Sequence, residues 1–229
     1  MTLNLNPKFA QVYQDTVELA NKHNIKLNFV DSYRIKYMDL DCKGYFTEPI
    51  YPYYERPELA IGIRDKNNVP CNGGIAWFDT WLHETSHMDQ YLQDKELYNS
   101  AKVHQGVQAL DLITLWVDKY IEIAPEKLHD IVSKAQKIEW DAEKRTIEKI
   151  RKYQLEDIYP IDKYAQNANT YLYLYRYMEK ERFWGDEKSV NIYEIDEIVS
   201  QMPTTIGDFT LYDTCPYFDL YCQYYSPLV

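Results

Sequence analysis

Residues 77–92 read WFDTWLHETSHMDQYL, and this stretch decides the fold expected of the chain. Apolar side chains recur through it at helical spacing, so it predicts one buried helix, which we extend over 75–93. Two histidines, His83 and His87, stand four residues apart inside it. Residues four apart in a helix project from the same face, so the two imidazole rings can approach a common point. A glycine pair at 73–74 precedes the helix and favours a turn.

The order His83-Glu84-x-x-His87 is typical of a catalytic zinc site. Two imidazoles on one helix face can bind a single Zn²⁺ ion at about 2.0–2.1 Å each. Glu84 lies about 100° further round the helix, so it can reach a metal-bound water without being forced into the ligand set. There it would act as a general base. We therefore expect one zinc ion held by His83 and His87, with Glu84 as the catalytic residue.

A zinc hydrolase needs a third protein ligand and leaves the fourth position to water. A metzincin would carry Gly at position 90 and His at position 93, but both are Gln, which excludes that class. The helix predicted over 125–155 offers Glu139, which falls within about 40° of Ala135 inside the apolar stripe of the helix. A carboxylate there is costly unless a metal or a cation compensates it. We predict Glu139 as the third ligand.

Glu143, one turn after Glu139, falls at the edge of the same stripe. It is a candidate to accept a hydrogen bond from the free ring N–H of a ligating histidine. The alternative is that Glu139 and Glu143 form ordinary ion pairs on the helix surface with neighbouring Lys or Arg residues. Asp141 points nearly opposite and is expected to face solvent. The other histidines lack a matching context and are interpreted as surface or satisfied polar residues: His23, His104 and His129.

The rest of the chain is read mainly as helices, with a little strand. Strands are expected over 25–30 and 59–64, and an irregular loop over 45–57. Further helices are expected over 9–23, 104–122, 125–155, 161–182 and 190–201. The aromatic tail after Pro203 should pack back on the body, because so many exposed rings would be costly. The sequence thus predicts an α+β fold, mainly helical, in one domain with three parts: sheet-containing (1–74), metal-site helices (75–155) and helical, aromatic C-terminal part (156–229).

The 229-residue chain carries a formal net charge of −11. An acidic chain repels phosphates and anionic lipids, so neither nucleic acid nor a membrane surface is an expected partner. The four cysteines are scattered without a C-x-x-C pair, which argues against a zinc knuckle and excludes a dense disulfide framework. Met1 to Lys8 lacks a signal-peptide pattern, and no apolar stretch approaches the roughly 20 residues that span a bilayer. We expect a soluble, cytoplasmic protein; the oligomeric state is not indicated.

His83-Glu84-x-x-His87 followed by Glu139-Trp-Asp-Ala-Glu143 resembles the gluzincin metallopeptidases. The E-x-D-A segment is also similar to the ImmA/IrrE class of small, often phage-associated metallopeptidases. The resemblance covers about residues 58–145 and implies a minimal zincin fold with a short sheet, an active-site helix and a ligand-bearing helix behind it. The 52 residues from His87 to Glu139 exceed the usual spacing in that class and imply an extra helix at 104–122.

The resemblance implies a peptidase that cleaves a peptide bond of a peptide or protein substrate with a zinc-activated water, in the producing cell or its host. It implies that strand 59–64 is the sheet edge along which an extended substrate pairs. An oxyanion-stabilising residue is also expected, and the candidates include Tyr164, Tyr171 and Tyr173. Two alternatives stay open. One is a zinc enzyme that hydrolyses an amide in a small molecule, and the other is a non-catalytic, acidic, tyrosine-rich interaction protein with a structural or absent metal.

Overall fold

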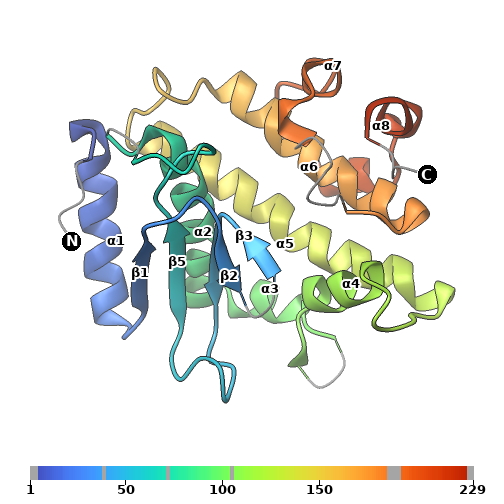
Figure 1. Cartoon of the computed structure of the whole chain (residues 1–229), viewed down its shortest axis with the longest axis horizontal. Helices are drawn as coiled ribbons and strands as arrows, with labels where there is room; N and C mark the ends of the chain where they lie inside the picture. The colour runs from blue at the N-terminus through green and yellow to red at the C-terminus, as the bar shows by residue number, and fades with distance from the viewer. Residues whose placement is uncertain (1–4, 38–39, 71–72, 104–105, 185–191, 226–229) are drawn as a thin grey trace. The chain divides into compact units, whose positions relative to one another are not determined.

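The computed structural model describes residues 5–37, 40–70, 73–103, 106–184 and 192–225. It is an α+β structure in which helices predominate (Figure 1), which confirms the mainly helical class predicted from the sequence. Contacts divide the chain into two compact units, Met1–Asp94 with Glu148–Tyr159, and Lys95–Ile147 with Pro160–Val229. None of the described helices is long and apolar enough to cross a membrane.

The first unit combines a small sheet with helices (Figure 1). β1 pairs parallel and β4 pairs antiparallel with β5, so the three-stranded sheet has the order β1-β5-β4. β2 and β3 form a separate antiparallel pair. The elements of this unit are η1 (Pro7–Phe9), α1 (Ala10–Lys22), β1 (Lys26–Val30), β2 (Ile35–Tyr37), β3 (Leu40–Cys42), β4 (Gly44–Thr47), β5 (Glu58–Gly62) and α2 (Ile75–Gln93).

The strand predicted over 59–64 forms as β5, but it is the central strand of the sheet. The expectation that it is a sheet edge is therefore wrong. All five residues of β5 are buried, and a strand buried on both faces belongs in the middle of a sheet, where its two neighbours satisfy its main-chain groups. The edges of this sheet are β1 and β4.

The loop predicted over 45–57 is irregular only in part, because its first residues belong to β4. Tyr45 and Phe46 pair with Ala60 and Leu59 of β5. A strand of four residues is too short to show a clear alternation of apolar and polar side chains. Its partner β5 lies elsewhere in the sequence, so the local pattern does not reveal the pairing. The same holds for β2 and β3, which the sequence pattern does not predict. The strand over 25–30 and the helix over 9–23 are confirmed as β1 and η1–α1.

The helix predicted over 75–93 is confirmed with the same bounds as α2. It begins after Gly74, whose φ of 78° lies in the left-handed region. A Cβ atom at this position would lie 3.0 Å from the ring of Trp77, so a side chain would be opposed by both backbone strain and space. Glycine is therefore the residue that lets the chain turn directly into α2.

Aromatic side chains fix α2 against the start of the chain and the sheet. Phe78 stacks on Phe9 of η1 with 3.8 Å between ring centroids, and Trp81 stacks on Phe29 of β1 at 5.0 Å. Phe9, Phe78 and Trp81 are each fully buried. Burial of each such side chain stabilises the fold by about 1.5–3 kcal/mol. This packed face therefore anchors α2 and fixes the positions of the side chains on its other faces.

The second unit is helical, and α5 continues from it into the first unit. Helices predicted over 125–155 and 161–182 are confirmed as α5 and α6. The helix predicted over 104–122 is shorter in the structure, where it forms α4. Two residues with positive φ flank it, Gly106 (79°) and Lys119 (64°). The elements are α3 (Lys95–Ser100), α4 (Ala109–Val117), α5 (Pro125–Lys152), α6 (Ile161–Glu181), η3 (Ile192–Glu194), α7 (Asp196–Val199), η4 (Phe209–Tyr212) and α8 (Phe218–Tyr224).

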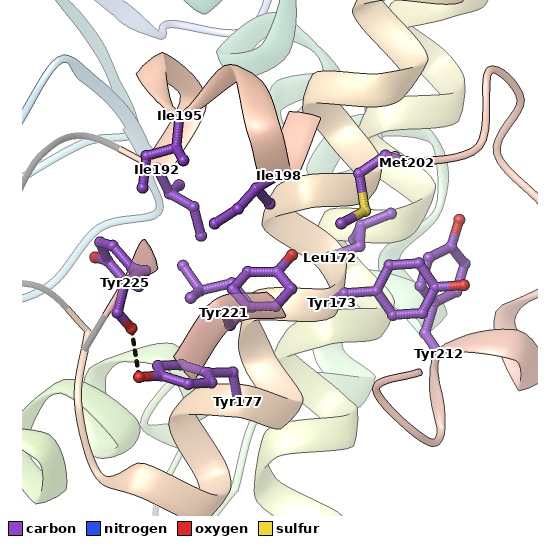
Figure 2. Close-up of a cluster of buried hydrophobic side chains, with 11 residues drawn as sticks. Leu172, Tyr173, Tyr177, Ile192, Ile195, Ile198, Met202, Tyr212, Tyr221 and Tyr225 are labelled. Atoms are coloured by element: carbon purple, nitrogen blue, oxygen red, sulfur yellow. Dashed lines mark hydrogen bonds between the residues drawn. The ribbon is translucent and has the colours of Figure 1, made fainter. Parts of the chain in front are cut away.

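The helix predicted over 190–201 divides into η3 and α7, because Ile195 between them has extended backbone angles (φ −92°, ψ 90°). Residues 190–191 lie outside the described residues. The aromatic tail packs on α6, as predicted (Figure 2). Tyr177 donates a hydrogen bond to the main-chain oxygen of Tyr225, and Tyr221 donates to that of Thr170 at 2.6 Å. Each buried phenol of this pair thus keeps a hydrogen-bond partner, as burial of a polar group requires.

Glu58→Gln should lower the free energy of unfolding by about 1–3 kcal/mol at neutral pH. Burial opposes the charge on Glu58, but hydrogen bonds from Lys26, Asn28 and Tyr45 outweigh it and hold the pKa of this carboxyl below its ordinary value. A lowered folded-state pKa stabilises the fold above the unfolded pKa, and that stabilisation is lost as the pH falls through the folded pKa.

Urea unfolding of wild type and Glu58→Gln across pH measures this difference. It should be full at neutral pH and shrink as the pH falls below about 4.3, the ordinary glutamate pKa. The exposed Glu55→Gln is the matched control and should change the unfolding free energy by less than about 0.5 kcal/mol. A Glu58→Gln difference that is independent of pH would contradict this account.

Candidate metal centre

α2 brings two imidazole nitrogens close together. His83 Nε2 and His87 Nε2 lie 3.1 Å apart, and the two ring planes are inclined at 84°. Two bare lone pairs at this distance would repel each other, so a proton or a cation must be shared between the two nitrogens. Ligands 2.0–2.1 Å from one zinc ion lie about 3.1–3.4 Å apart at angles near tetrahedral. The observed separation therefore fits two ligands of one ion.

Gln90 orients His87 for this role. The Nδ1 of His87 donates a hydrogen bond of 2.9 Å to Oε1 of Gln90, whose side chain is fully buried. This bond holds the ring hydrogen on Nδ1, so the lone pair on Nε2 is left for a metal. In the sequence, Gln90 indicates only that the chain lacks the glycine of a metzincin. Its position one turn after His87 is the signal that could have identified it.

Glu139 joins the two histidines. Among the described residues, the ligand atoms of His83, His87 and Glu139 all lie within 4.8 Å of one another, so this group could hold a metal ion. Two imidazoles and one carboxylate are a donor set found in catalytic zinc sites.

The buried stripe predicted for α5 is present. Glu139 and Glu143 are each only 6% exposed, and Ala135 and Ala142 beside them are buried too. This is not the environment of ordinary surface ion pairs, the alternative reading of the two carboxylates. Asp141 pairs instead with Arg145 one turn on, at 2.5 Å. The fold thus buries the two carboxylates that the helical pattern singles out.

Glu143 accepts a hydrogen bond of 2.6 Å from the hydroxyl of Tyr164 on α6. Its predicted bond to a ligating histidine stays a prediction, and Gln90 already fills that role for His87. Tyr164 is one of the three tyrosines considered for the oxyanion. This contact places Tyr164 beside Glu143, at the edge of the buried stripe of α5.

The other two tyrosines differ in their surroundings. The hydroxyl of Tyr171 lies 3.0 Å from that of Tyr175. Burial above all, and then nearby groups that include the Glu139 carboxylate, raise the pKa of both phenols well above the ordinary value, so both stay protonated. Tyr173 belongs to the tail cluster instead, with its ring 4.8 Å from that of Tyr212. The charge of Glu139 thus acts on Tyr171 and Tyr175, whereas Tyr173 belongs to the tail cluster, against which Tyr171 also packs.

Glu84 is 8% exposed on α2. Burial, and then the charge of Glu84, raise the pKa of the Cys42 thiol to about 12. This electrostatic effect requires proximity, so the β2–β3 pair lies near Glu84. Cys42 remains a neutral thiol at physiological pH, whereas a metal ligand would have to be a thiolate.

Lys149 of α5 braces the motif itself. Its ammonium donates hydrogen bonds to Thr85 Oγ1 (2.9 Å) and Ser86 Oγ (3.2 Å), the two variable residues of the motif, and pairs with Asp89 at 2.7 Å. The Thr85 and Ser86 hydroxyls in turn donate to the main-chain oxygen of Leu82. One half-buried cation thus ties the motif turn to α5. No simple periodicity in the sequence signals this contact.

The remaining histidines agree with their interpretation as polar surface residues where they are described. His23 is exposed. His129 is also largely exposed, and its Nδ1 lies 3.0 Å from Oε1 of Glu179. His104 lies outside the described residues.

Gln90→Leu should weaken zinc binding by about 10–100-fold, because the His87 ring loses the acceptor that fixes its orientation. Gln90→Glu keeps an acceptor oxygen and should retain affinity close to that of the wild type. Competition against a chromogenic chelator at fixed pH measures both. Equal affinities for the wild type and Gln90→Leu would show that Gln90 does not orient the ligand.

Lys149→Met should lower the free energy of unfolding by about 3 kcal/mol, because Asp89 is left without its cation in a largely buried position. The double variant Lys149→Met/Asp89→Leu removes both charges and should recover most of that loss. Urea unfolding of the two variants and of Asp89→Leu completes a double-mutant cycle. Additive effects in that cycle would mean that the ion pair contributes nothing.

No protein-family model matches this chain. No curated protein and no solved structure matches it at a significant level either.

Proposed function

We propose that the chain is a zinc-dependent hydrolase, and specifically a metallopeptidase of zincin-like type, as the resemblance to gluzincins implies. The observation that carries the proposal is the convergence of His83, His87 and Glu139, with the two imidazole nitrogens 3.1 Å apart. Three protein ligands leave one coordination position open for water or substrate, which is the arrangement of a catalytic site. A structural zinc site is closed by four protein ligands.

When bound, zinc would act as a Lewis acid that makes water more acidic and polarises the carbonyl of the scissile bond. His83 and His87 would hold it through Nε2, and Glu139 through a carboxylate oxygen. Gln90 would keep the His87 ring in the productive tautomer.

Glu84 would be the general base. It is adjacent to His83 on α2 but rotated about 100° round the axis, so its carboxylate flanks the ligand pair without being part of it. Glu84 would take the proton from the water that attacks the carbonyl carbon. It would then give that proton to the amine nitrogen as the carbon–nitrogen bond breaks. Its low exposure, 8%, favours this exchange, because bulk water competes less for the proton.

Tyr171 is the best placed of the three tyrosines for the oxygen that becomes negative in the reaction. The charge of Glu139 acts on its phenol, and burial keeps the hydroxyl protonated and able to donate. A preorganised donor in a dry site stabilises a developing charge far more than the same donor in water. Tyr164 is the second candidate, since it lies on the same helix beside Glu143.

An extended peptide would pair with β4. This strand is the antiparallel edge of the sheet, and it packs against α2, which carries the motif. Edge strands present unpaired main-chain groups that can hydrogen-bond to an added strand. This edge favours a peptide over a small-molecule amide as the substrate.

The proposal is tested by metal analysis of the purified full-length chain after zinc supplementation. We expect about one zinc ion per chain in the wild type and in Glu84→Gln, and much less in His83→Ala and Glu139→Ala, which lose a ligand. On a degenerate peptide library, Glu84→Gln should cleave about 10²–10⁴-fold more slowly than the wild type, because the base is lost while the ligands stay.

A wild-type chain without stoichiometric zinc would overturn the proposal. A chain that binds zinc, folds and cleaves no peptide would support the non-catalytic interaction protein instead. Full activity of Glu84→Gln would refute the role of the base while leaving the metal site intact. Circular dichroism of each variant checks that the loss of zinc is not a loss of fold.

A further inference from the structure

Asp79 lies on α2 one helical turn before His83. Residues 79, 83 and 87 are spaced by four, so their side chains project from the same side of the helix. Four residues rise about 6 Å along a helix axis, so Asp79 is offset by about this distance from the first histidine ligand. It is not near enough in sequence to be part of the motif.

The surroundings of Asp79 place it beside the edge strand. The next residue, Thr80, packs so close to Gly44 at the start of β4 that a Cβ atom on Gly44 would lie 3.0 Å from Thr80 Cγ2. The charge of Lys43, which precedes β4, is felt at the Asp79 carboxylate. Asp79 thus stands where the edge of the sheet meets the face of α2 that carries the histidines.

The Asp79 carboxylate is incompletely satisfied. Its Oδ1 accepts a hydrogen bond of 2.7 Å from the main-chain N–H of Thr80. Over the described part of the chain, Oδ2 has no hydrogen-bond donor and no cation within ion-pair distance. Lys43 is directed elsewhere, with Nζ 5.6 Å from the centroid of the Tyr33 ring.

The carboxylate is half-buried, so a group of a substrate can reach it. Burial raises the pKa of Asp79 above its ordinary value, and the hydrogen bond from Thr80 and the charge of Lys43 only partly oppose that shift. Asp79 is the fifth residue of α2, beyond the first turn, where the helix dipole favours an acid most. Neither an ion pair nor a helix cap engages the free oxygen of Asp79 among the described residues, so an incoming cation could pair with it.

We propose that Asp79 recognises a positively charged group of the peptide substrate, close to the scissile bond. An extended chain advances about 3.3 Å per residue, so an offset of about 6 Å corresponds to about two residues from the reacting carbonyl. The group is an ammonium or a guanidinium, from a Lys or Arg side chain or from a free amino terminus. This inference rests on the proposed peptidase function, which makes the substrate a peptide. The preference for a positive charge rests on Asp79 alone.

Binding to the full-length, zinc-supplemented Glu84→Gln chain tests it, because that variant should bind peptides without cleaving them. Acetylated and amidated peptides that differ only in Lys, norleucine or Glu at each position in turn are compared by fluorescence anisotropy. Lys peptides should bind about tenfold tighter than norleucine peptides at one position, a difference of about 1.4 kcal/mol. The double variant Glu84→Gln/Asp79→Asn should erase this preference and leave norleucine binding unchanged.

Peptides with a free amino terminus form the second arm. A preference for them that Asp79→Asn abolishes, with no preference for Lys, assigns the cation to the terminus. Glu84→Gln/Asp118→Asn removes an exposed negative charge at the end of α4 and should keep the wild-type preference, which controls for net charge. Asn is nearly the same size as Asp, so the variant should fold.

Equal binding of charged and neutral peptides, or a preference that survives Asp79→Asn, would overturn the inference. That outcome leaves the proposed function standing if the wild type holds zinc and cleaves peptides. Conversely, a chain without zinc overturns the proposed function, and the charge preference measured by binding still decides the role of Asp79. The two failures are thereby separated.

Discussion

The rest of the structure depends on two imidazole nitrogens being held 3.1 Å apart on one helix. Such a pair is unfavourable unless a proton or a cation is shared between them. α2 therefore has to be rigid, and three different interactions make it so. Stacked aromatic rings fix it against η1 and the sheet, Gln90 fixes the His87 ring, and Lys149 fixes the turn between the two histidines. Each acts on a different part of the helix, so none can replace another.

Buried acids are the second constraint. Glu84, Glu139 and Glu143 are each less than 10% exposed, although an isolated charge at such a position is strongly unfavourable. Part of the compensation is visible, since Tyr164 donates to Glu143. The many tyrosines of the chain fit this need, because a buried phenol offers a hydroxyl donor on a large apolar ring. The group of His83, His87 and Glu139 could also hold a metal ion, which would compensate part of this charge.

Long helices were predictable from the sequence, and short strands were not. The period of α2 and of α5 extends over many residues, so its bounds and its buried face can be read directly, including the position of Glu139. β4 consists of four residues and exists because β5 pairs with it from a distant part of the sequence. That same pairing made β5 a central strand and moved the edge to β4. The positions of Gln90 and Asp79 relative to the histidines can be inferred from helical spacing alone. The contact of Lys149 cannot, because it depends on which helix packs beside α2.

The edge strand and the motif helix meet at Asp79, and this explains how recognition and chemistry can be kept in register. A side chain on the same helix as the ligands cannot drift relative to them, because one turn of a helix fixes their spacing at about 6 Å. A loop residue would have no such constraint. An acid on this helix would therefore fix the distance between a bound substrate cation and the reacting bond. Asp79 is half-buried on this helix, so its carboxylate is open to a substrate cation while the opposite face of α2 stays packed.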